Sequence, residues 1–194
     1  VENPLPGCLH TLLTKSILTK AKTDTLTKTL KRIQKEPEVL AVKNQYKAAL
    51  KKAFEGSSNK QFAATKAATM TLDSLLGAMN ERKVAKDVIV DPTPAVSGAF
   101  TPEVHSNLSQ LDIRGAFVTA QGSGSNAGAM NQAGGTVVDF DEFLNILGLC
   151  GSIKYEEIKE MSLAQQVQAI VDNFLCRKDE RAVISEARGR RSKS

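Results

Sequence analysis

The chain has 194 residues, a formal net charge of +5 and three widely spaced cysteines. This length suffices for one or two domains that bury a core without disulfides, and Cys8, Cys150 and Cys176 lie in apolar segments, as buried reduced thiols do. No run approaches the roughly 20 apolar residues of a membrane span, and the N-terminus lacks the apolar stretch of a signal peptide. We therefore expect a cytoplasmic protein in a reducing compartment.

The first segment, 1–37, is rich in lysine and has a helical pattern. Its apolar residues recur at three- and four-residue spacing, which predicts two short amphipathic helices, with Asp24 as a cap of the second. Pro37 is expected to end one helix and open the next, because proline is tolerated in a first turn. The apolar residues are Leu9, Leu12, Leu13, Ile17 and Leu18, followed by Leu26, Leu30 and Ile33.

The second segment, 38–90, contains a strong helical stripe that begins near Val39 and stops at Gly56. After an alanine-rich loop, Met70 and Thr71 form an extended entry to a second helix, which we expect to run to about Lys86. The following Val88-Ile89-Val90-Asp91-Pro92-Thr93-Pro94 is predicted to be a break, since its two prolines forbid helix, and 91–100 is predicted to be a linker.

A third segment, 101–151, repeats this order. Thr101 and Pro102 are expected to cap and open a helix that ends at Gln121. Residues 122–135 are low in complexity and predict a flexible loop. The β-branched Val137 and Val138 then precede an outgoing helix. The first helix is expected to turn one side inward, consisting of Val104, Leu108, Leu111, Phe117 and Val118.

The C-terminal part is divided into a helical extension, 152–186, and a basic tail, 187–194. Residues Tyr155 to Glu160 are expected to form a turn or two of helix. Ser162 and Gln165 form a capping box, which predicts an amphipathic helix through Leu175.

The two middle segments can be superposed by placing 71–76 on 139–144. Residues 135–144, Gly-Thr-Val-Val-Asp-Phe-Asp-Glu-Phe-Leu, resemble the last half of an EF-hand calcium loop and its outgoing helix, as in the calmodulin and troponin C superfamily. The resemblance covers roughly 38–151. It implies an all-α fold with an EF-hand-like helix-loop-helix pair, N-terminal helices, a docked C-terminal helix, and a short two-stranded bridge that places Met70 opposite Val138.

The same resemblance locates candidate calcium ligands. With Glu142 at loop position twelve, Asn131 falls at position one and Asp139 at position nine, but carboxylates are missing from positions one, three and five. Ser74 replaces the glutamate in the first loop. We therefore expect no tight metal site and no cofactor, with Asn131, Asp139 and Glu142 as remnants that could bind Ca²⁺ weakly. The alternative is that Asp139 and Asp141 merely favour a helix N-terminus.

Basic residues gather at both ends of the chain and suit an acidic partner such as nucleic acid, anionic lipid or an acidic cytoskeletal lattice. The aromatic fraction of 5% argues against nucleic acid, which is commonly bound by stacking. The alternative is a solvated helix face and a disordered tail. The candidate partner-binding residues are Lys15, Lys20, Lys22, Lys28, Lys31, Arg32, Arg188, Arg190, Arg191 and Lys193.

No catalytic constellation is visible. His10 and His105 stand alone, and the glycine- and serine-rich run at 122–128 lacks the lysine and the preceding strand of a phosphate-binding loop. We therefore expect a non-enzymatic protein, although an enzyme of unrecognised type is a further alternative.

Residues 148–170 are similar to the stretch that follows the last EF-hand-like helix in certain proteins of motile cilia. This resemblance implies a C-terminal helix that fills the groove a calcium sensor would offer to its target. It favours a structural or adaptor protein of the microtubule cytoskeleton, in a ciliary or flagellar axoneme, with tubulin as a candidate partner. The alternative is a calcium-binding sensor or regulatory subunit. The oligomeric state is left open.

Overall fold

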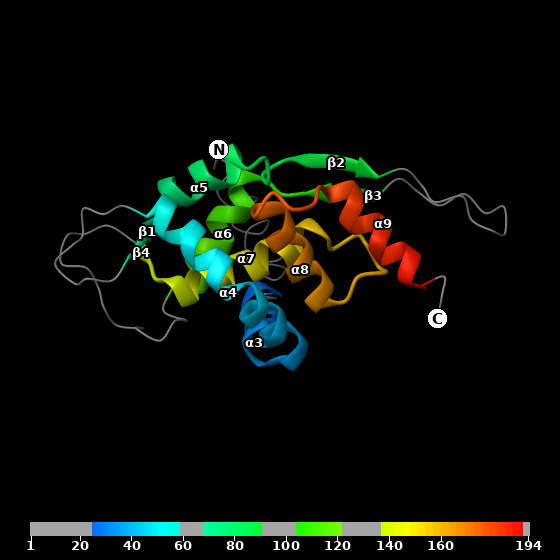
Figure 1. Cartoon of the computed structure of the whole chain (residues 1–194), viewed down its shortest axis with the longest axis horizontal. Helices are drawn as coiled ribbons and strands as arrows, with labels where there is room; N and C mark the ends of the chain where they lie inside the picture. Colours follow the sequence, from blue (N-terminus) through cyan, green and yellow to red (C-terminus); the bar gives the residue numbers. More distant parts are fainter. Residues whose placement is uncertain (1–24, 59–67, 91–103, 122–136, 192–194) are drawn as a thin grey trace, which may run out of the picture.

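The computed structural model describes residues 25–58, 68–90, 104–121 and 137–191. Within these ranges the chain forms seven helices and two small two-stranded antiparallel sheets (Figure 1), which confirms the all-α class. No helix in the described ranges is long and apolar enough to cross a membrane. The first of the two helices expected in segment 1–37, the Asp24 cap of the second, and the loop expected at 122–135 lie outside them.

Helices α3 (Thr25–Lys35) and α4 (Pro37–Ser57) meet at a proline, as the sequence predicted. Pro37 occupies the first turn of α4, where its missing N–H costs no intrahelical hydrogen bond. The Ile33 side chain of α3 packs closely on Gly148 of helix α7 (Phe140–Lys154). A Cβ atom added to Gly148 would lie 2.9 Å from Cγ2 of Ile33. The first described helix is therefore part of the core.

Two helix-loop-helix units form the body of the molecule, and a pair of strands joins their loops. Strand β1 precedes α5 as β4 precedes α7, and the two strands pair antiparallel with Met70 opposite Val138. The expected register of this bridge is confirmed. The elements are β1 (Met70–Thr71), α5 (Leu72–Glu81), α6 (Gln110–Ala120), β4 (Val137–Val138) and α7 (Phe140–Lys154).

A second antiparallel ribbon corrects the sequence prediction between the two units. Strand β2 (Asp87–Val90) pairs with β3 (Val104–Asn107), whereas a break and the start of a helix were expected there. Strand β2 contains three consecutive β-branched residues, 88–90, which favour an extended chain, and pairing with a distant strand decides its structure. Helix α5 also ends at Glu81 rather than near Lys86, and Lys83 adopts a left-handed φ of 56° just beyond it.

The start of α6 differs accordingly. Its N-cap is Ser109, whose hydroxyl accepts a hydrogen bond from the Asp112 N–H while the Asp112 carboxylate accepts one from the Ser109 N–H. This N-cap lies eight residues after Thr101, the cap predicted from the sequence. The prediction of the buried face of α6 is also partly wrong, because Leu111 and Val118 are exposed instead of lining the core.

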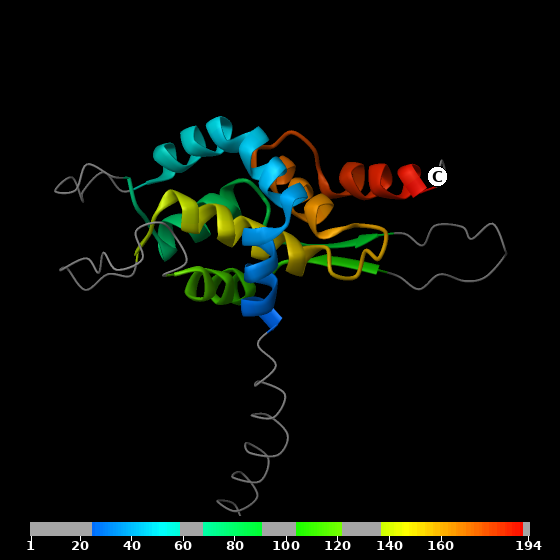
Figure 2. The same ribbon diagram turned by 90° about the horizontal axis from the view of Figure 1, so that it is seen from below.

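Helix α7 lies at the centre of the core. Figure 2 shows it between α4 and α6, and helix α8 (Leu163–Phe174) packs against it. Rings of α4, α7 and α8 touch in series, since the Phe54 and Phe143 centroids are 5.2 Å apart and those of Phe143 and Phe174 are 5.6 Å apart. The predicted docking of a C-terminal helix is confirmed.

The C-terminal part also departs from expectation in two places. Helix α7 continues to Lys154, and residues 155–157 and 159–160 form turns rather than helix. Helix α9 (Glu180–Arg191) was not anticipated and extends into the segment assigned to the basic tail. Of the cysteines, Cys150 is buried as expected, Cys176 is exposed, and Cys8 lies outside the described residues.

Candidate functional site

The remnant calcium ligands lie at the start of α7 and are bonded to the backbone. The Asp139 carboxylate accepts a hydrogen bond from the Glu142 N–H at 2.8 Å, and the Glu142 carboxylate accepts one from the Asp139 N–H at 2.9 Å. This reciprocal pair is a capping box, which satisfies two N–H groups that a helix start leaves open. Asn131 lies outside the described residues.

The first loop contains the uncharged counterpart of this cap. The Thr71 hydroxyl accepts a hydrogen bond from the Ser74 N–H at 3.2 Å at the start of α5. Thr71 and Ser74 therefore occupy the positions that Asp139 and Glu142 occupy in the second unit. Thr71 is the last residue of β1 and Asp139 directly follows β4. The two loops therefore share the order of strand and capped helix but differ in the charge of the cap.

No three His, Cys, Asp or Glu side chains come together in a metal-binding group among the described residues. The His105 imidazole instead contacts the Asp87 carboxylate across the β2–β3 ribbon at 3.3 Å, and the backbone N–H of His105 donates to the Glu157 carboxylate. Both contacts lie near the surface; the first joins the two strands of the ribbon, and the second holds the ribbon to the loop after α7.

Three of the predicted partner-binding residues lie exposed on α3, namely Lys28, Lys31 and Arg32. Arg32 also pairs with Glu36 at 2.7 Å. On α9, Arg188 is half-buried, and the side chains of Arg190 and Arg191 are not described. Lys15, Lys20, Lys22 and Lys193 lie outside the described residues. The described members of the predicted basic groups thus lie on two separate helices, α3 and α9.

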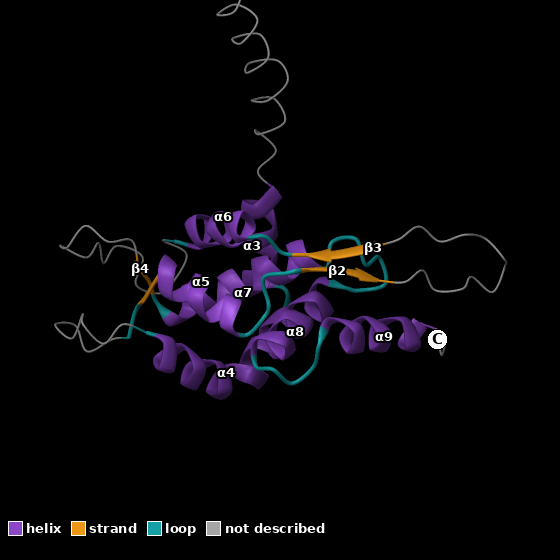
Figure 3. Ribbon diagram, turned by 90° about the horizontal axis from the view of Figure 1, so that it is seen from above, coloured by secondary structure: helices purple, strands orange, loops and turns teal. Residues whose placement is uncertain are grey.

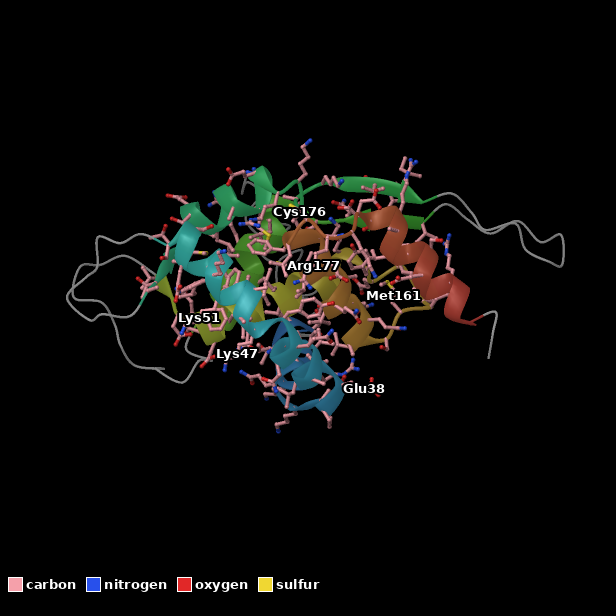
Figure 4. All side chains as sticks on the ribbon, viewed as in Figure 1. Glu38, Lys47, Lys51, Met161, Cys176 and Arg177 are labelled. Atoms are coloured by element: carbon pink, nitrogen blue, oxygen red, sulfur yellow. The ribbon has the colours of Figure 1, made fainter. Side chains whose placement is uncertain are left out.

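A second group of basic residues on α4 was missed by the sequence analysis. Lys47, Lys51 and Lys52 are exposed on the side of α4 that faces away from the core, and Figure 4 shows the first two on the same face. The signal was present, because Lys47 and Lys51 are four residues apart on the polar side of the apolar stripe. Residues 25–58 contain eight Lys or Arg and three Glu. The formal net charge of this region is therefore +5, the same as that of the whole chain.

One lysine of α4 behaves differently. Lys43 donates a hydrogen bond to the Asn145 side chain of α7 at 2.6 Å. Burial lowers the pKa of Lys43 to about 8, and the nearby Asp141 charge opposes this only in part. Lys43 therefore joins two helices and is not part of the exposed basic group.

A buried ion network joins three elements near the C-terminus. Lys154, fully buried at the end of α7, donates to the Glu180 carboxylate and to the Val84 carbonyl, each at 2.7 Å. Lys86 pairs with the other oxygen of Glu180 at 2.8 Å. Burial by itself would raise the pKa of Glu180, but the hydrogen bonds from Lys154 and Lys86 outweigh it, so this pKa lies below its usual value. The network holds α9 to the body.

A shallow groove lies between α8 and α9, lined by residues that include Met161, Asp172, Val183 and Glu186. Asp172 is buried, and Glu186 is held by Lys178 at 2.8 Å. The two carboxylates thus belong to packing contacts of the C-terminal helices. Comparison of the chain with known proteins gave no matching family model, curated protein or solved structure.

Proposed function

We propose that the protein is a non-enzymatic structural or adaptor component of the microtubule cytoskeleton, in a ciliary or flagellar axoneme of the cytoplasm. Its body is an EF-hand-like pair that does not bind calcium tightly. The observation that carries the proposal is the pairing of Met70 with Val138 between two loops, each followed by a helix whose N-cap side chain accepts a backbone hydrogen bond. Among the described residues, the paired-loop architecture is present without a group of three His, Cys, Asp or Glu side chains.

The packing of α8 supports a rigid body. A Cβ atom added to Gly151 of α7 would lie 2.6 Å from the Gln166 carbonyl oxygen of α8, closer than a Cβ atom approaches a backbone oxygen. The two helices are therefore in backbone contact, and opening a groove between them would expose Phe143 and Phe174. A calcium sensor exposes such a groove when it is activated, so this packing favours a constant shape over a switch.

The exposed basic residues of α3 and α4 support an acidic partner. Basic residues outnumber acidic ones by five in 25–58. The exposed lysines of this region include Lys28 and Lys31 on α3 and Lys47 and Lys51 on α4. Such a surface attracts an acidic lattice such as tubulin, and the attraction weakens as the screening length falls from about 10 Å at 0.1 M salt to about 3 Å at 1 M.

Co-sedimentation with microtubules tests this proposal. We expect the full chain to sediment with microtubules at low salt and to be released as salt rises. The variant Lys47→Gln/Lys51→Gln should bind more weakly, whereas a control with the same charge change elsewhere, Lys83→Gln/Lys159→Gln, should bind like the natural chain. No salt-sensitive binding, or an equal loss in the control, would contradict the proposed partner.

A further inference from the structure

The groove between α8 and α9 contains a buried carboxylate without a direct partner. Asp172 lines the groove but is only 4% exposed. Its backbone carbonyl accepts hydrogen bonds from the N–H groups of Arg177 and Lys178, whereas no hydrogen bond or ion pair of the described residues reaches its side chain. Asp172 also lies in the last turn of α8, where the helix dipole disfavours an anion. A buried aspartate is rare unless it is paired, so this position calls for a cation.

Lys178 lies near the groove, but its ammonium group is bound to Glu186. It donates to both carboxylate oxygens of Glu186, each at 2.8 Å. This hydrogen bond is the main reason that the pKa of Lys178 is raised, and the charge of Asp172 is a smaller cause. Asp172 is thus close enough to attract Lys178 without being paired with it. Counting Lys178 with the lining residues, two carboxylates face one ammonium group, which leaves a formal charge of −1.

The walls of the groove are mostly apolar. Its lining residues recur at three- and four-residue spacing on α8 and on α9, so each set lies on one face of its helix. Asp172 shares its face with Gln168, whose side chain adds a neutral amide. Figure 3 shows α8 and α9 next to each other, and the two helices are in contact. The apolar side chains of the lining are Met161, Ala169, Val183 and Ala187.

We propose that this groove binds a lysine or arginine side chain of a partner protein. The methylene stem of the basic side chain lies along Ala169, Val183 and Ala187, and its charged head donates to the Asp172 carboxylate. The groove is shallow, so it accepts one extended side chain and does not enclose a small molecule. This site goes beyond the acidic partner proposed for α3 and α4 and does not rest on it.

Titration of the full chain with capped amino acids tests the groove. The probes are N-acetyl-lysine methylamide and N-acetyl-arginine methylamide, and N-acetyl-norleucine methylamide is the control with a similar stem and no charge. In ¹H–¹⁵N correlation spectra, we expect both basic probes to shift the amides of Ala169, Asp172 and Val183 with a Kd on the order of millimolar, as ligands of this size allow. The norleucine probe should bind at least about tenfold more weakly, because it cannot pair with the carboxylate.

The variant Asp172→Asn separates binding from packing. Asparagine keeps the shape of the side chain and loses its charge, so the affinity for both basic probes should fall at least about tenfold. The same variant should unfold at a temperature no lower than the natural chain, since it removes an unpaired buried charge. The control Glu81→Gln removes one charge from an exposed residue of α5 and should leave probe binding unchanged.

Several results would overturn the proposal. The groove amides show no saturable shift with either basic probe, or the norleucine probe binds as tightly as they do. Asp172→Asn binds the basic probes like the natural chain, or it unfolds at a clearly lower temperature, which would show that the carboxylate holds the C-terminal helices. Calcium chloride alone shifts the same amides at the same concentration, which would assign Asp172 to an inorganic cation. Failure of microtubule binding would leave these measurements unaffected.

Discussion

Met70 lies opposite Val138 in the antiparallel bridge between the two helix-loop-helix units, and both side chains are fully buried. The contact joins positions 68 residues apart through backbone pairing and apolar packing. Each residue precedes the cap of an outgoing helix, Thr71 in one unit and Asp139 in the other. The bridge therefore fixes the relative positions of α5 and α7.

Truncation of the bridge should destabilise the whole fold. Met70→Ala removes a fully buried side chain, so we expect the free energy of unfolding to fall by about 2–5 kcal/mol. The control Leu40→Ala, at a partly exposed position of α4, should cost much less. Urea unfolding monitored by far-ultraviolet circular dichroism measures both. Equal losses in the two variants would mean that the bridge does not join the units.

Two glycines should respond in opposite directions to alanine. Gly151→Ala places a Cβ atom 2.6 Å from the Gln166 oxygen and must displace α8, which we expect to cost about 1–3 kcal/mol. Gly77 lies inside α5 with nothing within 4 Å of its Cβ position, so Gly77→Ala should stabilise the protein by about 0.5–1 kcal/mol. Thermal unfolding of the two variants measures both effects. A stabilising effect of Gly151→Ala would contradict the close contact between α7 and α8 at Gly151.

The buried ion network should matter far more than the surface pair on the same helix. Glu180→Gln leaves Lys154 buried without its counter-charge, and we expect a loss of about 3–5 kcal/mol. The control Glu186→Gln breaks the exposed pair with Lys178 and should cost no more than about 1 kcal/mol. Denaturant unfolding at neutral pH compares them. Similarly small losses in Glu180→Gln and Glu186→Gln would show that the packing of α9 on the body does not depend on Glu180.

Lys43 predicts a pH dependence of defined sign. Its pKa is lowered to about 8 in the folded protein from 10.5, so the unfolded chain binds more protons between these values. The free energy of unfolding contributed by Lys43 should therefore rise as pH increases from 8 to 10.5. Burial raises the pKa of Cys150 and Tyr155, so these two groups make the free energy of unfolding fall as pH rises. Their contribution is the same in the natural chain and in a Lys43→Met variant.

The difference between those two proteins therefore isolates Lys43. Unfolding free energies measured at pH 7.5 and pH 10 should show the natural chain gaining on Lys43→Met at the higher pH. A difference that stays flat, or falls, would contradict the burial of the ammonium group between α4 and α7.

Local signals made much of the fold predictable. Pro37, the cap at Ser162 and the β-branched pair before Asp139 each act on the residues next to them, and each predicted its element correctly. The register of Met70 with Val138 followed from the superposition of the two units. Capping and apolar spacing are visible in sequence because their partners are three or four residues away.

Contacts between distant residues were not predictable in this way. Strand β2 pairs with β3 across residues 91–103, and the prolines in that interval suggested a break instead of a connection. The partner of Lys154 is 26 residues away in a helix that the sequence pattern did not reveal. The residues at the start of α7 were identified, but their role as a cap depends on hydrogen bonds that a residue pattern shared with calcium loops does not distinguish.

Isothermal titration calorimetry with Ca²⁺ tests the central claim most directly. The account holds that Asp139 and Glu142 cap α7 and leave no tight cation site, so the full chain should give no heat of binding at micromolar Ca²⁺. Glu142→Gln is the matched variant, because glutamine retains an oxygen for the Asp139 N–H while losing the charge. Micromolar binding that Glu142→Gln abolishes would contradict the account and establish a calcium site.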